Sequence, residues 1–145
     1  MPPIRLRTLK LIGKRVPVEL REEIRQEMAL LRERIPDVDG SIVCSVDGLT
    51  LASDLGRDIA AEQTGALSSA LLALSRRMTG MAGKGTFEET LISGTNGYAA
   101  CYAAGPKIVL TVLARPGTNL GLLRLEGRKT AARLAAITSR ISITQ

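Results

Sequence analysis

The chain has 145 residues, of which 45% are apolar and 23% are charged, and it contains no histidine. This length and composition are those of one globular domain with its own core. Without histidine the chain lacks the commonest general base and metal ligand, which excludes Ser-His-Asp and Cys-His catalysis within it. The aromatic residues are Phe87, Tyr98 and Tyr102, so aliphatic side chains must build the core.

The net charge of +6 is concentrated at the N-terminus. Residues 1–17 carry the basic residues Arg5, Arg7, Lys10, Lys14 and Arg15 and no acidic one, whereas the rest is nearly neutral. A nearly neutral body with few aromatic residues argues against nucleic-acid binding. The basic segment could contact an anionic membrane or an acidic partner, although a solvated tail explains it more simply. Within it, residues 4–16 fit either a short helix or an added strand.

Targeting segments, cofactors and metals have little support in the sequence. No apolar run approaches the roughly 20 residues of a membrane-spanning helix, and the N-terminus lacks a signal-peptide stretch, so we expect a cytoplasmic protein. Cys44 and Cys101 lie in apolar runs without CxxC spacing, which favours buried, reduced thiols over metal ligands or nucleophiles. We expect no cofactor and no metal.

Residues 18–35 (VELREEIRQEMALLRERI) have the pattern of an amphipathic helix. Apolar residues recur three or four positions apart, at Leu20, Ile24, Met28, Leu31 and Ile35. Acidic residues lead and arginines follow, as the helix dipole prefers, and Pro36 ends the helix.

The stretch SIVCSVDGLTLAS (41–53) predicts a β-hairpin. Asp47-Gly48 between two apolar runs favours a type I′ turn, which needs positive φ at both central residues. That turn would pair Val46 with Leu49, Cys44 with Leu51, Ile42 with Ser53, Ser45 with Thr50, and Val43 with Ala52. The nearby Asp37 and Asp39 lack the ligand number and spacing of an EF-hand loop, so we interpret them as turn residues.

Residues 58–81 predict a second helix, which Asp58 can cap. Its apolar stripe consists of Leu67, Leu71, Leu74 and Met78, and many of its other residues are small. A core helix lying on a sheet and an interface helix are equally supported, and both can hold on different faces. The following GMAGKGT (80–86) is no phosphate loop, because glycine follows its lysine and a helix precedes it.

Two further runs, TFEETLISG (86–94) and YAACYAA (98–104), flank Asn96-Gly97 and predict a second type I′ hairpin. In that register Ile92 would lie opposite Cys101, and Leu91 opposite Tyr102. IVLTVLA (108–114) is apolar on both faces, as expected of a strand in the middle of a covered sheet.

The last helix is predicted over residues 116–137, with Thr118 or Asn119 as its cap. Gly127 in its middle costs about 1 kcal/mol relative to alanine, so we expect a close packing contact there. The order is helix, two strands, helix, three strands, helix. It predicts an α+β fold: an α/β/α sandwich with a five-stranded antiparallel sheet.

From about Val18 to Ile137 the chain resembles the roadblock (dynein light chain) family. The resemblance rests on SIVCSVDGLTLAS, TGALSSALLAL, FEETLISG, IVLTVLA and NLGLLRLEGRKTAARLAAI, in this order. It is closest in type to the MglB-like stand-alone bacterial members and those of actinobacterial operons. We therefore divide the chain into a basic segment (1–17), a roadblock domain (18–137) and a C-terminal tail (138–145).

The resemblance implies a homodimer or heterodimer that regulates a Ras-like small GTPase, in MglB-like members by reshaping the GTPase rather than by inserting an arginine. Dimers of the family join their sheets through the third strand and pair their second helices. That interface would here comprise Ala66, Leu67, Ala70, Leu71, Ala73, Leu74, Thr86, Phe87, Glu88, Glu89 and Thr90. The GTPase surface, chosen by expected exposure on the helix and not by a matched motif, would include Glu62, Gly65, Ser68, Ser69, Arg76 and Arg77.

The same residues give less support to other functions. A scaffold without a GTPase, or a small-molecule sensor, remains an alternative, but few polar residues converge to line a pocket. For an enzymatic function, the sequence offers no pair of nucleophile and general base. Arg76 and Arg77 invite comparison with an arginine finger, but exposed helix arginines that aid solubility are the simpler interpretation.

Overall fold

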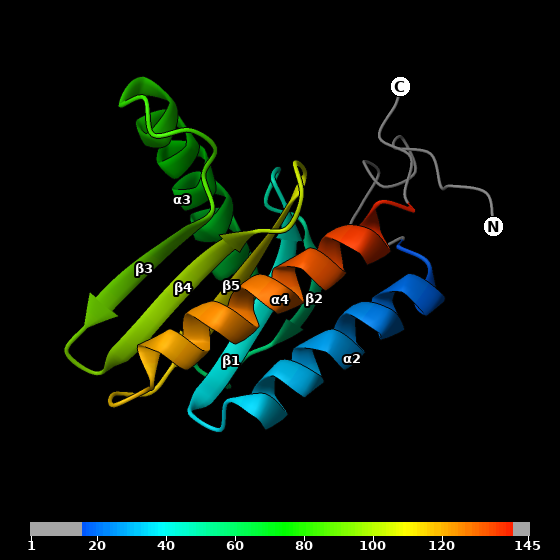
Figure 1. Cartoon of the computed structure of the whole chain (residues 1–145). Helices are drawn as coiled ribbons and strands as arrows, with labels where there is room; N and C mark the ends of the chain where they lie inside the picture. The colour runs from blue at the N-terminus through cyan, green and yellow to red at the C-terminus, as the bar shows by residue number, and fades with distance from the viewer. Residues whose placement is uncertain (1–15, 141–145) are drawn as a thin grey trace.

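The computed structural model describes residues 16–140 (Figure 1). The expectations for residues 1–15 and 141–145, which include most of the basic segment and part of the tail, lie outside the described residues.

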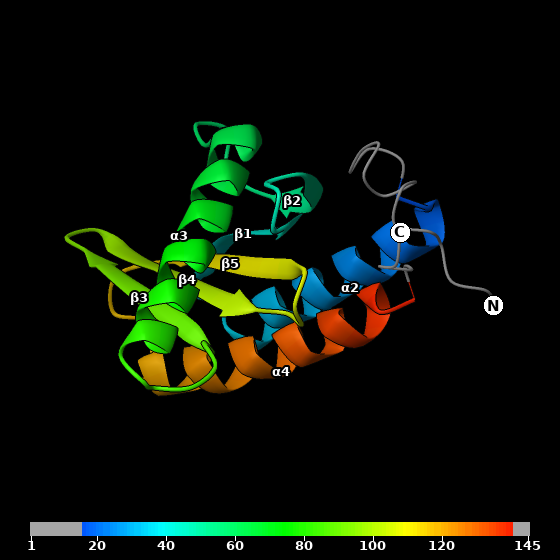
Figure 2. The same ribbon diagram turned by 90° about the horizontal axis from the view of Figure 1, so that it is seen from above.

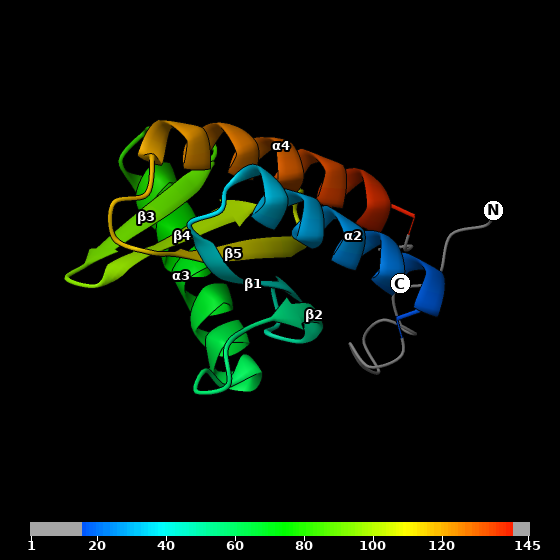
Figure 3. The ribbon, with the colours of Figure 1, turned by 90° about the horizontal axis from the view of Figure 1, so that it is seen from below.

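A five-stranded antiparallel sheet in the order β2-β1-β5-β4-β3 forms the middle layer of the fold. The helix α3 crosses one face of this sheet (Figure 2), and α2 and α4 lie side by side on the other face (Figure 3). The predicted element order and α/β/α sandwich are therefore confirmed. The elements are α2 (Val18–Arg34), β1 (Val38–Ser45), β2 (Thr50–Asp54), α3 (Ala61–Met81), β3 (Glu89–Gly94), β4 (Gly97–Ala103), β5 (Ile108–Ala114) and α4 (Leu120–Thr138).

The strand β5 lies at the centre of the sheet, as its two apolar faces predict. Alternate residues of the strand enter two different cores. Ile108, Leu110 and Val112 join the larger core, under α2 and α4. Val109 joins the smaller core under α3, with Cys44, Leu72, Phe87 and Cys101.

The first hairpin has a different turn from the predicted one. Only Gly48 in it has positive φ, so Asp47 does not adopt the type I′ conformation. Ser45 N–H donates to the Leu49 carbonyl at 2.9 Å, which leaves a three-residue loop, Val46 to Gly48. Ile42 and Val43 pair as predicted, but Cys44 lies opposite Thr50 and not Leu51, with the register shift of a β-bulge between. The pairs predicted nearest the turn are therefore wrong.

The second hairpin also differs, by two residues. Its loop is Thr95-Asn96, so Ile92 lies opposite Ala99 and Leu91 opposite Ala100, not Cys101 and Tyr102. Gly97 belongs to β4, where a Cβ atom would lie 2.3 Å from the Ala114 carbonyl oxygen of β5. Because side chains alternate with period two, this shift keeps each of them on its predicted face.

A capping side chain is present at the start of α4 and absent at the start of α3. Asn119, one of the two residues predicted as its cap, caps α4, where its side chain accepts a hydrogen bond from Leu122 N–H at 3.0 Å. Asp58 does not cap α3, which begins at Ala61 with no side-chain cap.

Gly127 of α4 makes the close contact that its cost in a helix predicts. A Cβ atom there would lie 2.4 Å from Tyr102 Cζ. The Tyr102 ring is buried under α4, and its hydroxyl donates to the Leu123 carbonyl at 3.2 Å. The glycine therefore makes room for the fully buried aromatic side chain of this core.

We expect Gly127→Ala to destabilise the protein by about 1–3 kcal/mol, because overpacking outweighs the better helix propensity of alanine. Urea unfolding measures this change. Gly121→Ala is the matched control on the same helix, because its Cβ would meet only Asn119 Oδ1, at 3.5 Å. Equal stabilities of the two variants would show that the Tyr102 ring moves away without cost.

Candidate interaction surface on helix α3 and strand β3

The helix α3 turns two of its small residues and Leu72 to the sheet and other leucines to solvent. Gly65 and Ser68 are buried, and a Cβ atom on Gly65 would lie 3.1 Å from the Gly48 carbonyl oxygen. Ser68 Oγ accepts a hydrogen bond from Thr111 Oγ1 at 2.7 Å. By contrast, Leu67 is 71% exposed. A core helix and an exposed apolar helix thus occupy opposite faces of one element.

The exposed apolar side chains adjoin a groove of about 500 Å³ between α3 and the sheet. Its few polar groups already bond within the protein, because Thr111 Oγ1 donates to Ser68 Oγ and contacts Cys101 Sγ at 3.4 Å. A contiguous apolar surface of this kind is typical of an interaction site. The groove is lined by Ile59, Thr64, Leu67, Ser68, Ala70, Leu71, Leu74, Ile92, Ala99, Ala100, Cys101, Thr111 and Leu113.

The strand β3 borders this groove and forms one edge of the sheet. Its outer N–H and C=O groups have no neighbouring strand within residues 16–140, and Leu91 and Ile92 on it are exposed. An open edge with exposed apolar side chains is a template for pairing with another strand.

The residues predicted for the dimer interface differ in how exposed they are. Phe87 is buried in the core under α3, so its side chain is not on the exposed surface. Leu71, Glu89 and Thr90 are partly buried. The exposed members are Ala66, Leu67, Ala70, Ala73, Leu74, Thr86 and Glu88.

The residues predicted for a GTPase surface divide in the same way. Gly65 and Ser68 are buried against the sheet, so the exposure assumed for them is wrong. Glu62 and Arg77 are exposed, and Ser69 is partly buried. Arg76 donates to the carbonyl oxygens of Gly105 at 3.2 Å and Pro106 at 3.1 Å, so its guanidinium is held against the loop between β4 and β5.

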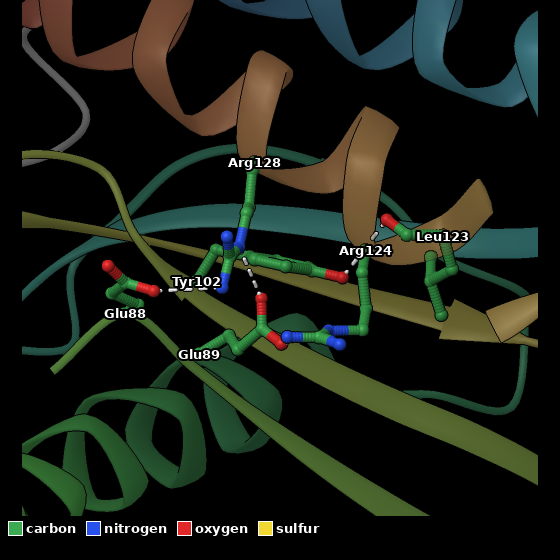
Figure 4. A network of polar contacts seen from close by, with 6 residues as sticks. All are labelled: Glu88, Glu89, Tyr102, Leu123, Arg124 and Arg128. Carbon is green, nitrogen blue, oxygen red and sulfur yellow. Dashed lines mark hydrogen bonds and ion pairs between the residues drawn. The ribbon is translucent and has the colours of Figure 1, made fainter. Parts of the chain in front are cut away.

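Glu88 and Glu89 form ion pairs with two arginines of α4 that the sequence reading missed (Figure 4). Arg128 Nε lies 2.7 Å from Glu89 Oε1, and its terminal nitrogen Nη2 lies 2.8 Å from Glu88 Oε1. Arg124 pairs with the second oxygen of Glu89. The i,i+4 spacing of the arginines was the available signal, because it puts both on one face of a helix.

This network lowers the pKa of the Glu89 carboxyl group. Burial opposes ionisation, but hydrogen bonds from Arg128 and Arg124 outweigh it and hold the pKa below 4.5. The carboxylate therefore ties the first residue of β3 to α4 at neutral pH.

Neither cysteine is equipped for catalysis. Both thiols are free and buried, as predicted. Burial, and to a smaller extent the nearby Cys101, raises the pKa of Cys44 to about 12, so its thiolate is scarce at neutral pH. In the described part of the chain, no three His, Cys, Asp or Glu side chains come together as a metal site would require. No helix there is long and apolar enough to cross a membrane.

We expect Glu89→Gln to lower the free energy of unfolding at neutral pH by about 1 kcal/mol or less, because the pairs are half-exposed. A carboxyl group whose folded pKa is depressed stabilises the fold above its unfolded pKa and loses this effect as pH falls through the folded value. The difference between wild type and variant should therefore shrink as the pH falls below 4.5. Urea unfolding at several pH values measures it; a difference independent of pH would contradict the assigned role.

Comparisons with known proteins identify a family for this chain. The family model of the Roadblock/LC7 domain matches residues 24–114. The uncharacterized protein MJ1340 of Methanocaldococcus jannaschii is 37% identical over 100 residues, which cover 69% of this chain and 87% of MJ1340. MJ0714 of the same organism is 34% identical over 116 residues, covering 80% of this chain and 98% of MJ0714.

Solved structures share the fold. Myxococcus xanthus MglB is 20% identical, with a TM-score of 0.79 over 90% of this chain and 98% of MglB. A Roadblock/LC7 domain from Streptomyces avermitilis is 24% identical, with a TM-score of 0.70 over 77% of this chain and 93% of that domain. Another MglB structure, described as a tetrameric arrangement, has a TM-score of 0.76 at 16% identity over 86% of this chain and 93% of that MglB. The chain therefore belongs to the Roadblock/LC7 family.

Proposed function

We propose that this protein is a non-catalytic, homodimeric regulator or adaptor of a Ras-like small GTPase, with residues 18–137 as the working domain. One observation carries the proposal: an exposed leucine stripe on α3 lies beside an apolar groove and an open sheet edge. A soluble monomer rarely leaves such a surface uncovered. Membership of the roadblock family supplies the class of partner.

A second copy of the chain fits the groove and the edge together. Leu67 and Leu74 are 71% and 64% exposed, and they would be buried against the α3 helix of the other copy. Two β3 strands can pair across a two-fold axis, because an isologous interface uses the same patch on both subunits. One sheet would then continue through both copies.

The GTPase would bind the surface that the paired α3 helices present. Of the residues expected there, Glu62, Ser69 and Arg77 remain accessible at least in part, whereas Gly65 and Ser68 do not. Arg76 is held by loop carbonyls, so regulation through a reshaped GTPase fits this geometry better than insertion of that arginine.

A small-molecule sensor is the second candidate, because about 500 Å³ is enough space for a ligand. The polar groups in the groove, however, already bond to one another. Ligands are usually fixed by a few unpaired polar groups, so we rank this function below the first.

We expect Leu67→Asp to convert the dimer to a folded monomer, because a carboxylate cannot be buried unpaired in an apolar interface. Light scattering after size-exclusion chromatography measures the mass, and circular dichroism checks the fold. Leu125→Asp is the matched control, because Leu125 is 52% exposed on α4. A monomeric wild type, or a Leu67→Asp dimer, would exclude this interface.

The GTPase itself is tested by binding to the Ras-like protein encoded nearest the gene, loaded with GDP or with a GTP analogue. We expect tighter binding of the GTP form, because a regulator of the active state must distinguish the two nucleotides. Calorimetry measures both affinities, and a hydrolysis assay then shows whether turnover is accelerated. Absence of binding in both states would leave the fold and the dimer but remove the proposed partner.

A further inference from the structure

The two sides of the sheet differ in how many of their basic side chains form ion pairs. On the side of α2 and α4, most cations pair with carboxylates. The C-terminal end of α3 differs, because Arg76, Arg77, Lys84 and Lys107 have no carboxylate within 4.0 Å in residues 16–140. The pairs on the other side are Arg25–Glu22, Arg32–Asp54, Arg34–Glu126, Arg124–Glu89, Arg128–Glu88, Arg128–Glu89, Lys129–Glu126, Arg133–Glu27 and Arg140–Glu23.

Local contacts gather these four cations at one end of the molecule. Arg76 bonds the carbonyl oxygens of Gly105 and Pro106, which brings the neighbouring Lys107 to α3. Lys84 N–H donates to the Thr79 carbonyl at 2.8 Å, which folds the following loop back on the last turn of the helix. Two acidic residues lie near them. Asp47 is in the β1–β2 turn, where Val46 N–H donates to the Lys107 carbonyl at 2.9 Å. Glu88 follows Lys84 by four residues and pairs with Arg128. The four cations therefore outnumber the carboxylates.

Two exposed apolar side chains lie on the same end of α3 as these basic residues. Met78 is 72% and Met81 83% exposed, and both belong to the last turns of α3. The C-terminal end of α3 projects beyond the sheet in Figure 1. None of the residues that line the apolar groove lies beyond Leu74 on this helix. A second copy seated in the groove would therefore leave this end of α3 accessible.

We propose that Arg77, Met78, Met81, Lys84 and Lys107, the basic end of α3, form a docking surface for an acidic protein patch. This inference rests on the proposed function and adds the chemistry of the partner. The Ras-like GTPase would present carboxylates around an apolar contact. Arginine and methionine are enriched in protein interfaces, and the flexible methionine side chain adapts to irregular surfaces.

Each group has its own part in this docking. Arg77, Lys84 and Lys107 attract the acidic patch before contact, so they raise the association rate in a salt-dependent way. Met78 and Met81 bury apolar area after contact and slow dissociation. Arg76 is a positioning residue, because it holds the loop that carries Lys107.

An anionic membrane is the other surface that a basic patch attracts. Helices that lie in a membrane interface carry tryptophan, phenylalanine or leucine on their apolar face. Beyond Leu74, α3 offers only Met78 and Met81 as large apolar residues. The composition therefore favours a protein partner.

The test is the association rate with the neighbouring Ras-like GTPase, measured by biolayer interferometry at several salt concentrations. We expect Arg77→Glu combined with Lys84→Glu to lower this rate at least about tenfold at low salt, and to weaken its salt dependence. Met78→Gln combined with Met81→Gln should raise the dissociation rate instead. Light scattering should show both variants as dimers, and urea unfolding should give the same midpoints as wild type.

The matched control is Arg25→Glu combined with Lys129→Glu, which makes the same charge change on α2 and α4. These side chains are 54% and 53% exposed, and their ion pairs of 3.6 and 4.0 Å contribute little to stability. If both charge variants bind like wild type, or lose binding equally, the docking surface is wrong while the proposed function stands.

Two further outcomes would overturn the inference. If the wild type binds the GTPase in neither nucleotide state, the proposed function fails and the docking surface fails with it. If wild type sediments with vesicles of phosphatidylserine and phosphatidylcholine, and Arg77→Glu combined with Lys84→Glu does not, the surface contacts a membrane and not an acidic protein.

Discussion

The packing of α3 on the sheet is the contact on which the rest of the interaction surface depends. Gly65 allows the helix backbone to approach the β1–β2 turn, where any Cβ atom would meet the Gly48 carbonyl oxygen. Ser68 then bonds Thr111 of the central strand. With its small residues against the sheet, the helix must turn Leu67 and Leu74 outward. The exposure of these two leucines is thus a consequence of close approach on the opposite face of the same helix.

Strand order adds the second half of this surface. The sheet places β5 in the middle and β3 at an edge, so the exposed helix and the open edge lie on the same side of the molecule. The edge begins at Glu89, which Arg124 and Arg128 tie to α4. The carboxylates of Glu88 and Glu89 thereby serve the fold of one chain, although the Glu88 side chain remains 69% exposed. The backbone of β3 and its apolar side chains remain available.

Periodicity and turn residues were enough to predict the element order, the central strand and, with Thr118 as the alternative, the Asn119 cap. They failed where backbone geometry in three dimensions decides. Asp47-Gly48 predicts a tight turn, yet a bulge beside Leu51 is needed to accommodate a longer loop. Gly97 resembles a turn glycine, but it serves the close approach of β4 to β5. Gly65 and Ser68 were assigned to solvent because a helical pattern alone cannot tell which of two plausible faces meets the sheet.

The two sides of the sheet differ in how many of their charged and apolar side chains have a partner within the described chain. On the α2–α4 side, carboxylates neutralise most of the arginines, and Gly127 lets α4 close over Tyr102. On the α3 side, leucines, methionines and several cations have no partner within residues 16–140. Packing and ion pairs within one chain account for most of the first side, where Leu125 remains exposed. In the proposed function, other molecules cover the second side, the leucines by an apolar contact and the basic end of α3 by an acidic one.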